Sequence, residues 1–140
     1  MKKVFSDIDL ESLDKLSAEL LGLFPQKRLF AFRGNLGAGK TTFIKAICKK
    51  LGLSEQLSSP SYAIANVYFA KEEIYHVDLY RLSGMEEAIE AGIEEYIDGK
   101  HYCFIEWPDI IIPLLPEDTV MISMSLNKNL NRTIEISCNE

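Results

Sequence analysis

A short apolar segment runs directly into a glycine-rich loop in the sequence LFAFRGNLGAGKTT, residues 29–42. Residues 34–41 match the pattern G-x-x-x-x-G-K-[ST] at every fixed position, which is the signature of a phosphate-binding P-loop. The apolar run at residues 29–32 predicts a buried strand, and the residues after the loop predict a helix at 41–50. Together they predict the first βα unit of an α/β domain.

The residue types in this loop suit the chemistry of a bound triphosphate. Its glycines, at positions 34, 37 and 39, allow unusual backbone angles and leave room for several N–H groups to converge on one anion. The N-terminus of the helix that follows adds a partial positive charge. We therefore expect Lys40 to contact the β and γ phosphates and the Thr41 hydroxyl to bind Mg²⁺.

Two carboxylates are candidates for the acidic group that a P-loop uses with its metal ion. Glu106 ends the apolar run at residues 102–105, and Asp78 lies in a strand-like segment at 74–80. A carboxylate at such a position is costly unless it faces a cation or solvent. We expect Glu106 to be the Mg²⁺ partner and Asp78 to lie nearer the attacking water, although the two roles could be exchanged. With Lys40, these two acids are the predicted catalytic residues.

Two neighbours of the acids have weaker signals. His76 is two residues before Asp78 and would share its face of a strand, and we interpret it as a hydrogen-bonded surface histidine rather than a catalytic one. Trp107 follows Glu106 directly and is expected either to stack on a base or partner or to pack against the protein.

The other segments complete a mixed α/β pattern. A capping-box pattern at residues 6–9 predicts the start of a helix that ends at Pro25. Strands are predicted at residues 63–69, 74–80, 102–105, 119–126 and 132–137, and a short acidic helix at 85–91. We therefore expect a single P-loop ATPase domain over residues 1–140, with a central mixed, mostly parallel sheet flanked by helices and a C-terminal antiparallel hairpin.

Composition narrows the function classes. The net charge of −6 argues against direct nucleic-acid binding, because such affinity comes mainly from Lys and Arg. No apolar run is long enough to cross a membrane, and the first residues do not resemble a signal peptide, so a cytoplasmic location is expected. The three cysteines, at positions 48, 103 and 138, lack C-x-x-C spacing and are expected to be reduced thiols.

Adenine is favoured over guanine as the bound base. The closest match to the guanine-reading motif N-K-x-D is NKNL at residues 127–130, which lacks the Asp. From the residues alone, three functions stay open: a P-loop ATPase, a small-metabolite kinase, and a nucleotide-binding regulator that does not hydrolyse its ligand. Residues 84–99 are acidic, which counts against the kinase because an acidic lid binds phosphates poorly.

Four segments, taken in order, resemble the TsaE (YjeE) family. They are GNLGAGKTT at residues 34–42, SPSY at 59–62, YHVDLYRL at 75–82 and IEWP at 105–108. The resemblance implies a small P-loop ATPase that binds ATP and Mg²⁺ and has a central mixed sheet. It also implies a role in adding a threonylcarbamoyl group to the adenosine next to the tRNA anticodon. ATP hydrolysis, weak alone, would then support turnover of a complex of TsaD and TsaB, with tRNA met only indirectly through that complex.

The resemblance also assigns roles by position. Thr41 and Glu106 would hold Mg²⁺, and Asp78 would be a second essential acid. Residues 59–61 would form a switch-like loop near the γ-phosphate, and residues 7–12 would lie near adenine. The chain departs from the family pattern at Asn35, usually Asp, and at Ser61, usually Thr. The residues expected to bind the nucleotide are Leu36, Gly37, Ala38, Gly39, Lys40, Thr41 and Thr42.

Overall fold

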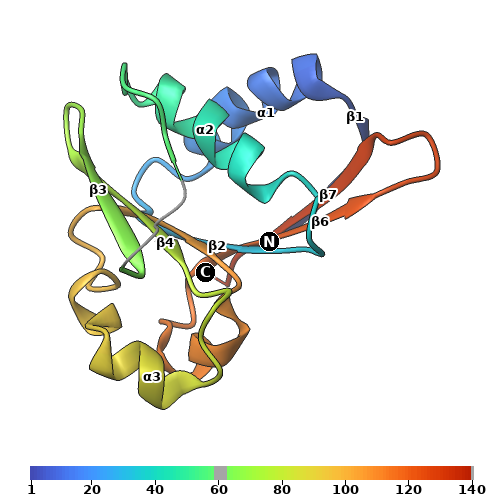
Figure 1. The fold of residues 1–140 in the computed structure, drawn as a ribbon. Coiled ribbons are helices and arrows are strands. Elements are labelled where there is room, and N and C mark those ends of the chain that lie inside the picture. The colour runs from blue at the N-terminus through green and yellow to red at the C-terminus, as the bar shows by residue number, and fades with distance from the viewer. Residues whose placement is uncertain (59–62, 140) are drawn as a thin grey trace.

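One seven-stranded sheet, with helices on both faces, organises the protein (Figure 1). The structure is a computed structural model that describes residues 1–58 and 63–139. In chain order the elements are β1 (Lys2–Ile8), α1 (Leu10–Leu23), β2 (Leu29–Arg33), α2 (Lys40–Lys50), β3 (Ala65–Phe69), β4 (Glu73–Asp78), α3 (Met85–Glu90), the 3₁₀ helix η1 (Ile93–Glu95), β5 (Tyr102–Glu106), the 3₁₀ helix η2 (Pro108–Leu114), β6 (Val120–Leu126) and β7 (Arg132–Ser137).

The strand order in the sheet is β1-β7-β6-β2-β5-β4-β3. The central strands are parallel: β2 pairs with both β5 and β6, and β4 pairs with β5. The outer pairs β3–β4, β6–β7 and β1–β7 are antiparallel. The predicted mixed sheet and its C-terminal antiparallel hairpin are confirmed, and the carboxyl ends of β2, β4 and β5 meet at one edge.

The sheet separates two hydrophobic cores. α1 and α2 cover one face, where Phe30, Phe32 and Phe104 are fully buried (Figure 1). α3, η1 and η2 form the other face with Val77 and Ile105. Successive strand residues point to opposite faces, so strands covered on both sides are apolar throughout. This alternation decides which side chains of β4 and β5 point toward α2.

The N-terminus differs from the sequence prediction. Residues 6–8 lie in β1, and α1 is capped instead by Asp9, whose carboxylate accepts a hydrogen bond from the Ser12 N–H at 2.8 Å. The predicted helix start was wrong because β1 takes its hydrogen bonds from β7, at the far end of the chain. Asp7 has a φ of 55°, and its carboxylate accepts a hydrogen bond from Asn127 Nδ2 at 2.9 Å, which joins the end of β1 to the β6–β7 turn.

Other segments agree with the predictions within a few residues. β4 ends at Asp78 rather than at residue 80, because the Asp78 carboxylate accepts the Tyr80 N–H at 3.0 Å and starts a turn. η1 and η2 were not predicted, and the expected switch-like loop at residues 59–61 lies outside the described residues.

All three cysteines are free and buried, and burial raises the pKa of the Cys48 thiol to about 12. Among the described helices, none is long and apolar enough to cross a membrane.

Candidate functional site

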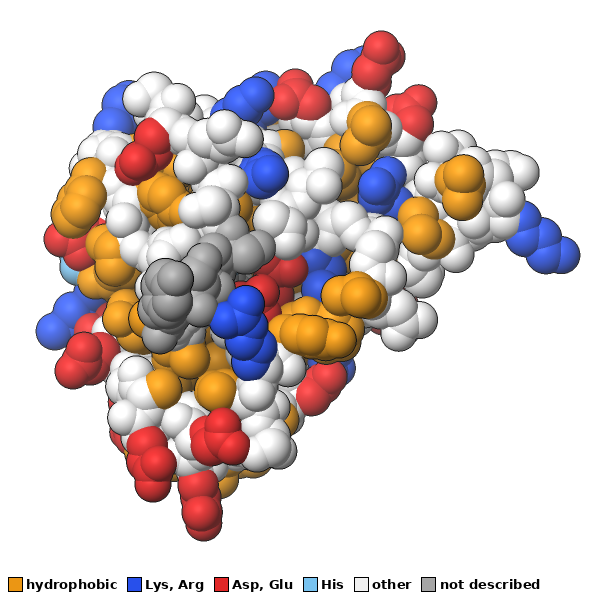
Figure 2. Space-filling view, in the orientation of Figure 1, with side chains coloured by type: hydrophobic (Ala, Val, Ile, Leu, Met, Phe, Trp, Pro, Cys, Tyr) orange, Lys and Arg blue, Asp and Glu red, His pale blue; other side chains and the backbone are white. Residues whose placement is uncertain are grey.

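A cavity of about 360 Å³ lies at the edge of the sheet where β2, β4 and β5 end. This edge is where open α/β sheets bind their ligands. Figure 2 shows acidic, basic and hydrophobic side chains meeting at a hollow on one face of the molecule. The residues predicted to act in catalysis, to hold the metal ion and to bind the nucleotide all line the cavity, together with three others: Leu36, Gly37, Ala38, Gly39, Lys40, Thr41, Thr42, Asp78, Glu106, and then Tyr80, Trp107 and Arg132.

The glycines give the loop its shape. Gly39 precedes α2 with a φ of 97°, in the left-handed region, and a Cβ added there would lie 2.4 Å from Arg132 Nε. A Cβ on Gly34 would lie 2.6 Å from the Met124 carbonyl oxygen. Among the described residues, no side chain caps the start of α2, so its first N–H groups remain open to an anion. The loop is therefore a cradle that fits a phosphate group.

Lys40 lies against the loop and is only 5% exposed. Its ammonium donates a short hydrogen bond to the Gly34 carbonyl and a longer one to the Asn35 carbonyl at 3.4 Å. Burial lowers the pKa of Lys40 from its ordinary value, whereas the carboxylates of Glu106 and Asp78 act to raise it. The ammonium is thus held by neutral carbonyls that an incoming phosphate oxygen could replace.

Trp107 forms one wall of the cavity. Its ring lies 3.6 Å from the Lys40 ammonium, measured to the ring centroid, and 5.0 Å from the Tyr80 ring. The backbone of Trp107 has a φ of 58°, in the left-handed region that bulky residues rarely adopt. The structure shows Trp107 in contact with Lys40 and Tyr80, and stacking on a base or partner stays a prediction. The ring covers the Lys40 ammonium through a cation–π contact.

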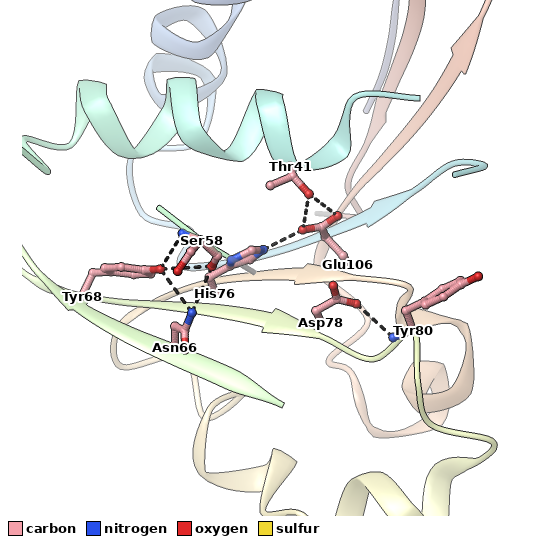
Figure 3. Close-up of polar contacts among 8 residues, drawn as sticks. All are labelled: Thr41, Ser58, Asn66, Tyr68, His76, Asp78, Tyr80 and Glu106. Carbon is pink, nitrogen blue, oxygen red and sulfur yellow. Dashed lines mark hydrogen bonds and ion pairs between the residues drawn. The ribbon is translucent and has the colours of Figure 1, made fainter. Parts of the chain in front are cut away.

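Thr41 and Glu106 meet although 65 residues separate them. The Thr41 hydroxyl lies in the first turn of α2, 2.9 Å from each carboxylate oxygen of Glu106 (Figure 3). Glu106 ends β5, and it points toward α2 because it shares a face with Phe104. The two residues expected to hold Mg²⁺ are therefore in direct contact.

Asp78 lies beside Glu106 on the neighbouring strand. The two residues are paired in register between β4 and β5, and Figure 3 shows their carboxylates on adjacent strand ends. One Asp78 oxygen, Oδ1, accepts the Tyr80 N–H, so the turn after β4 holds this carboxylate at the cavity. The Thr41 hydroxyl donates its hydrogen bond to Glu106. Of the two acids, Glu106 is therefore the one in direct contact with the first turn of α2.

His76 is not the surface histidine that was predicted. It is fully buried, and its Nε2 lies 2.6 Å from Glu106 Oε2 (Figure 3). The prediction was wrong because the face of β4 that carries His76 packs into the core beneath α1 and α2. The local sequence does not reveal this packing. The period-two alternation of Ile74, His76 and Asp78 did place them on one face, and that face is the one toward Glu106.

Arg132 is a site residue that the sequence reasoning missed. It begins β7, and its Nε donates a hydrogen bond to the Ala38 carbonyl of the loop at 3.1 Å. Its guanidinium packs against Gly39, so it reaches the P-loop from nearly a hundred residues away in sequence. No motif marks this arginine, and its position directly after the predicted hairpin turn was the sole available signal.

A second, larger cavity of about 500 Å³ adjoins the loop. It lies between α1, α2 and the segment after α2, and it shares Thr42 with the first cavity. Leu10, within the segment expected near adenine, lines it, and apolar side chains of Leu13, Leu53 and Leu57 form much of its surface.

The chain is similar to one family of known proteins over most of its length. The family model "Threonylcarbamoyl adenosine biosynthesis protein TsaE" matches residues 8–134. A Treponema pallidum (strain Nichols) protein named tRNA threonylcarbamoyladenosine biosynthesis protein TsaE is 35% identical over 115 residues, covering 82% of this chain and 85% of that protein. The Borreliella burgdorferi protein of the same name is 41% identical over 96 residues, covering 67% of this chain and 69% of that protein.

A solved structure extends the likeness to nearly the whole fold. The crystal structure of Bacillus subtilis YdiB superposes with a TM-score of 0.76 at 26% sequence identity, and the match covers 99% of this chain and 84% of that one. Since the family model spans most of the chain and these relatives exceed 30% identity over most of it, the chain belongs to the TsaE family of threonylcarbamoyl adenosine biosynthesis proteins.

Proposed function

We propose that the protein is a Mg²⁺-dependent ATPase whose phosphate site is the cavity at the P-loop. The observation that carries this proposal is the contact between Thr41 and Glu106 at the uncapped start of α2. A hydroxyl and a carboxylate placed side by side at a phosphate cradle are the protein ligands that Mg²⁺ takes beside a nucleotide. Within residues 1–58 and 63–139, no group of three or more His, Cys, Asp and Glu could hold a metal alone, so phosphate oxygens would complete the coordination.

Each side chain then has a distinct task. The N–H groups of residues 36–42 would bind the phosphate oxygens, and Lys40 would move from the loop carbonyls to the γ-phosphate as negative charge develops there. Thr41 and Glu106 would hold Mg²⁺, which would supply positive charge to offset that of the phosphates. Asp78, whose carboxylate is held beside Glu106 by the turn after β4, would orient the attacking water.

The larger cavity is our candidate for the adenine end of the nucleotide. It continues from Thr42, at the start of α2, toward Leu10 and apolar side chains that would contact a base. Nucleotide sites are typically apolar with few polar groups, and a cavity of about 500 Å³ is large enough for a nucleoside.

In the cell, we infer that ATP hydrolysis supports turnover of the TsaD–TsaB transferase complex in the cytoplasm. Family membership supports this role, because the relatives are named for tRNA threonylcarbamoyladenosine biosynthesis. The net charge of −6 favours contact with tRNA only through the complex, since a chain of this charge has little electrostatic affinity for phosphate backbones.

An ATPase assay with and without the partners tests the proposal. We expect slow hydrolysis by the protein alone and faster turnover after TsaD and TsaB are added at saturating ATP. An unchanged rate with the partners would exclude the accessory role. Partner-independent phosphoryl transfer to a small acceptor would identify a metabolite kinase instead, and tight ATP binding without hydrolysis in any mixture would identify a regulator.

Arg132→Ala is expected to weaken ATP binding by about 10–100-fold, because a hydrogen bond from a charged group is worth about 1.5–3 kcal/mol and each 1.4 kcal/mol is a factor of ten. The variant loses the bond to the Ala38 carbonyl and a positive charge at the cavity. Isothermal titration with ATP would measure the change. Lys128→Ala removes an exposed charge from the same hairpin and serves as the control; an equal affinity loss in both variants would show a general charge effect.

A further inference from the structure

His76 is a buried histidine that the proposed chemistry does not use directly. Its side chain is completely inaccessible, and its Nε2 lies 2.6 Å from Glu106 Oε2. The same carboxylate oxygen also lies 2.9 Å from the Thr41 hydroxyl. His76, Glu106 and Thr41 therefore form a continuous chain from β4 through β5 to the first turn of α2 (Figure 3).

The direction of the His76 bond follows from its partners. An ionised carboxylate can only accept, so the proton between the two side chains belongs to Nε2. Among the described residues, Nδ1 is buried and has no hydrogen-bond partner. Nε2 is therefore the ring nitrogen that donates to Glu106, and Nδ1 takes no part in this contact.

The His76 Nε2–H can fix the rotation of the Glu106 carboxylate, which the Thr41 hydroxyl cannot do. Thr41 has a single hydroxyl proton, and it lies 2.9 Å from both carboxylate oxygens of Glu106, so it can serve either one. His76 reaches Oε2 alone and comes from a different strand. The carboxylate is thereby held in one rotation, with Oε1 left to accept a further ligand.

We propose that His76 is a positioning residue that sets the orientation of Glu106 for Mg²⁺ and the Thr41 hydroxyl. This inference rests on the proposed ATPase function, in which Glu106 is a ligand of Mg²⁺. Outer groups that hold metal-binding carboxylates commonly change metal affinity by about 10–100-fold when removed. The effect of His76 should accordingly appear in the Mg²⁺-dependent part of nucleotide binding and not in binding as a whole.

His76→Leu is the direct test, because leucine fills a similar buried volume without a donor. The measurement is ATP affinity by isothermal titration, once with excess Mg²⁺ and once with EDTA. We expect the gain in affinity that Mg²⁺ produces to fall by about tenfold or more, with affinity in EDTA unchanged. His76→Gln, which can place an amide N–H near the Nε2 position, is expected to restore most of the gain.

The chain supplies a matched control in its other histidine. His101→Leu removes a half-buried ring that lies 3.8 Å from Glu73, away from the loop, and should leave both affinities as in the wild type. An equal Mg²⁺ gain in His76→Leu and wild type overturns the positioning role alone. Equal losses with Mg²⁺ and EDTA would show a merely structural role and also overturn it. A wild type that gains nothing from Mg²⁺ would instead remove the proposed function.

A second measurement uses the wild-type protein and does not depend on a variant folding. Nitrogen-15 chemical shifts of the His76 ring, read by long-range proton–nitrogen correlation, report which nitrogen carries a proton. We expect a protonated Nε2 in the nucleotide-free protein. An unprotonated Nε2 would mean that His76 donates nothing to Glu106, and the inference would be wrong.

Discussion

Single-turnover ATP hydrolysis by Lys40→Ala is expected to fall by about 10²–10³-fold, the usual cost of removing one donor to a developing negative charge. In the structure the Lys40 ammonium is bonded to two loop carbonyls and lies 3.6 Å from the Trp107 ring centroid. These neutral contacts leave its charge free to act on a phosphate. Charge on the γ-phosphate oxygens changes most as the bond breaks, so hydrolysis should suffer more than ATP affinity.

The design must separate the charge of Lys40 from its packing. Lys40→Met retains most of the aliphatic stem beside Trp107 and removes only the ammonium, so it should lose as much activity as Lys40→Ala. Lys100→Ala, at an exposed position before β5 and outside both cavities, is the control and should hydrolyse ATP at the wild-type rate. Wild-type single-turnover rates in both Lys40 variants would contradict the assignment of the loop.

For Glu106→Gln, we expect about a 100-fold loss of the Mg²⁺-dependent gain in ATP affinity, with little change in EDTA. Gln has the size of Glu but carries no charge, so the metal ion loses its carboxylate ligand. Its amide would also have to place an NH₂ group toward either His76 or Thr41, each of which already donates to this position. Both effects act on the metal ion and not on the phosphate cradle.

Isothermal titration with and without Mg²⁺ measures this difference. Glu106→Ala should show the same Mg²⁺-specific loss and would confirm that the charge is responsible. Glu117→Gln changes an exposed acid before β6 and should bind as the wild type does. A Glu106→Gln protein whose affinity rises with Mg²⁺ as much as that of the wild type would transfer the metal role to Asp78.

The sequence predicted that Glu106 and Asp78 belong to the site, but it did not distinguish their roles. Glu106 and Asp78 were both identified from their positions after apolar runs, but their roles were left exchangeable. The register of β4 and β5 pairs them on adjacent strands, and the Thr41 hydroxyl then contacts Glu106. That distinction depends on where α2 packs over the sheet, and no spacing in the sequence encodes it.

The strand, the P-loop and the helix after it were determined by the sequence alone, because short-range rules govern them. Glycine at residues 34, 37 and 39 allows the backbone angles that the loop requires. The alternation of side chains along a strand decides which of them share a face of the sheet. The family resemblance rests on four short segments, and the hairpin on two strands and the turn between them. Within each of these, the residues are neighbours in the chain.

The tertiary structure alone placed β1 beside β7, buried His76 under α2 and brought Arg132 to the Ala38 carbonyl. Each of these features joins residues far apart in sequence, where pairing depends on the arrangement of the whole sheet and not on local preference. The contact chain from His76 through Glu106 to Thr41 is of this kind, since its three members come from β4, β5 and α2. Long-range packing, which local sequence patterns do not record, therefore decided the orientation of the groups within the site.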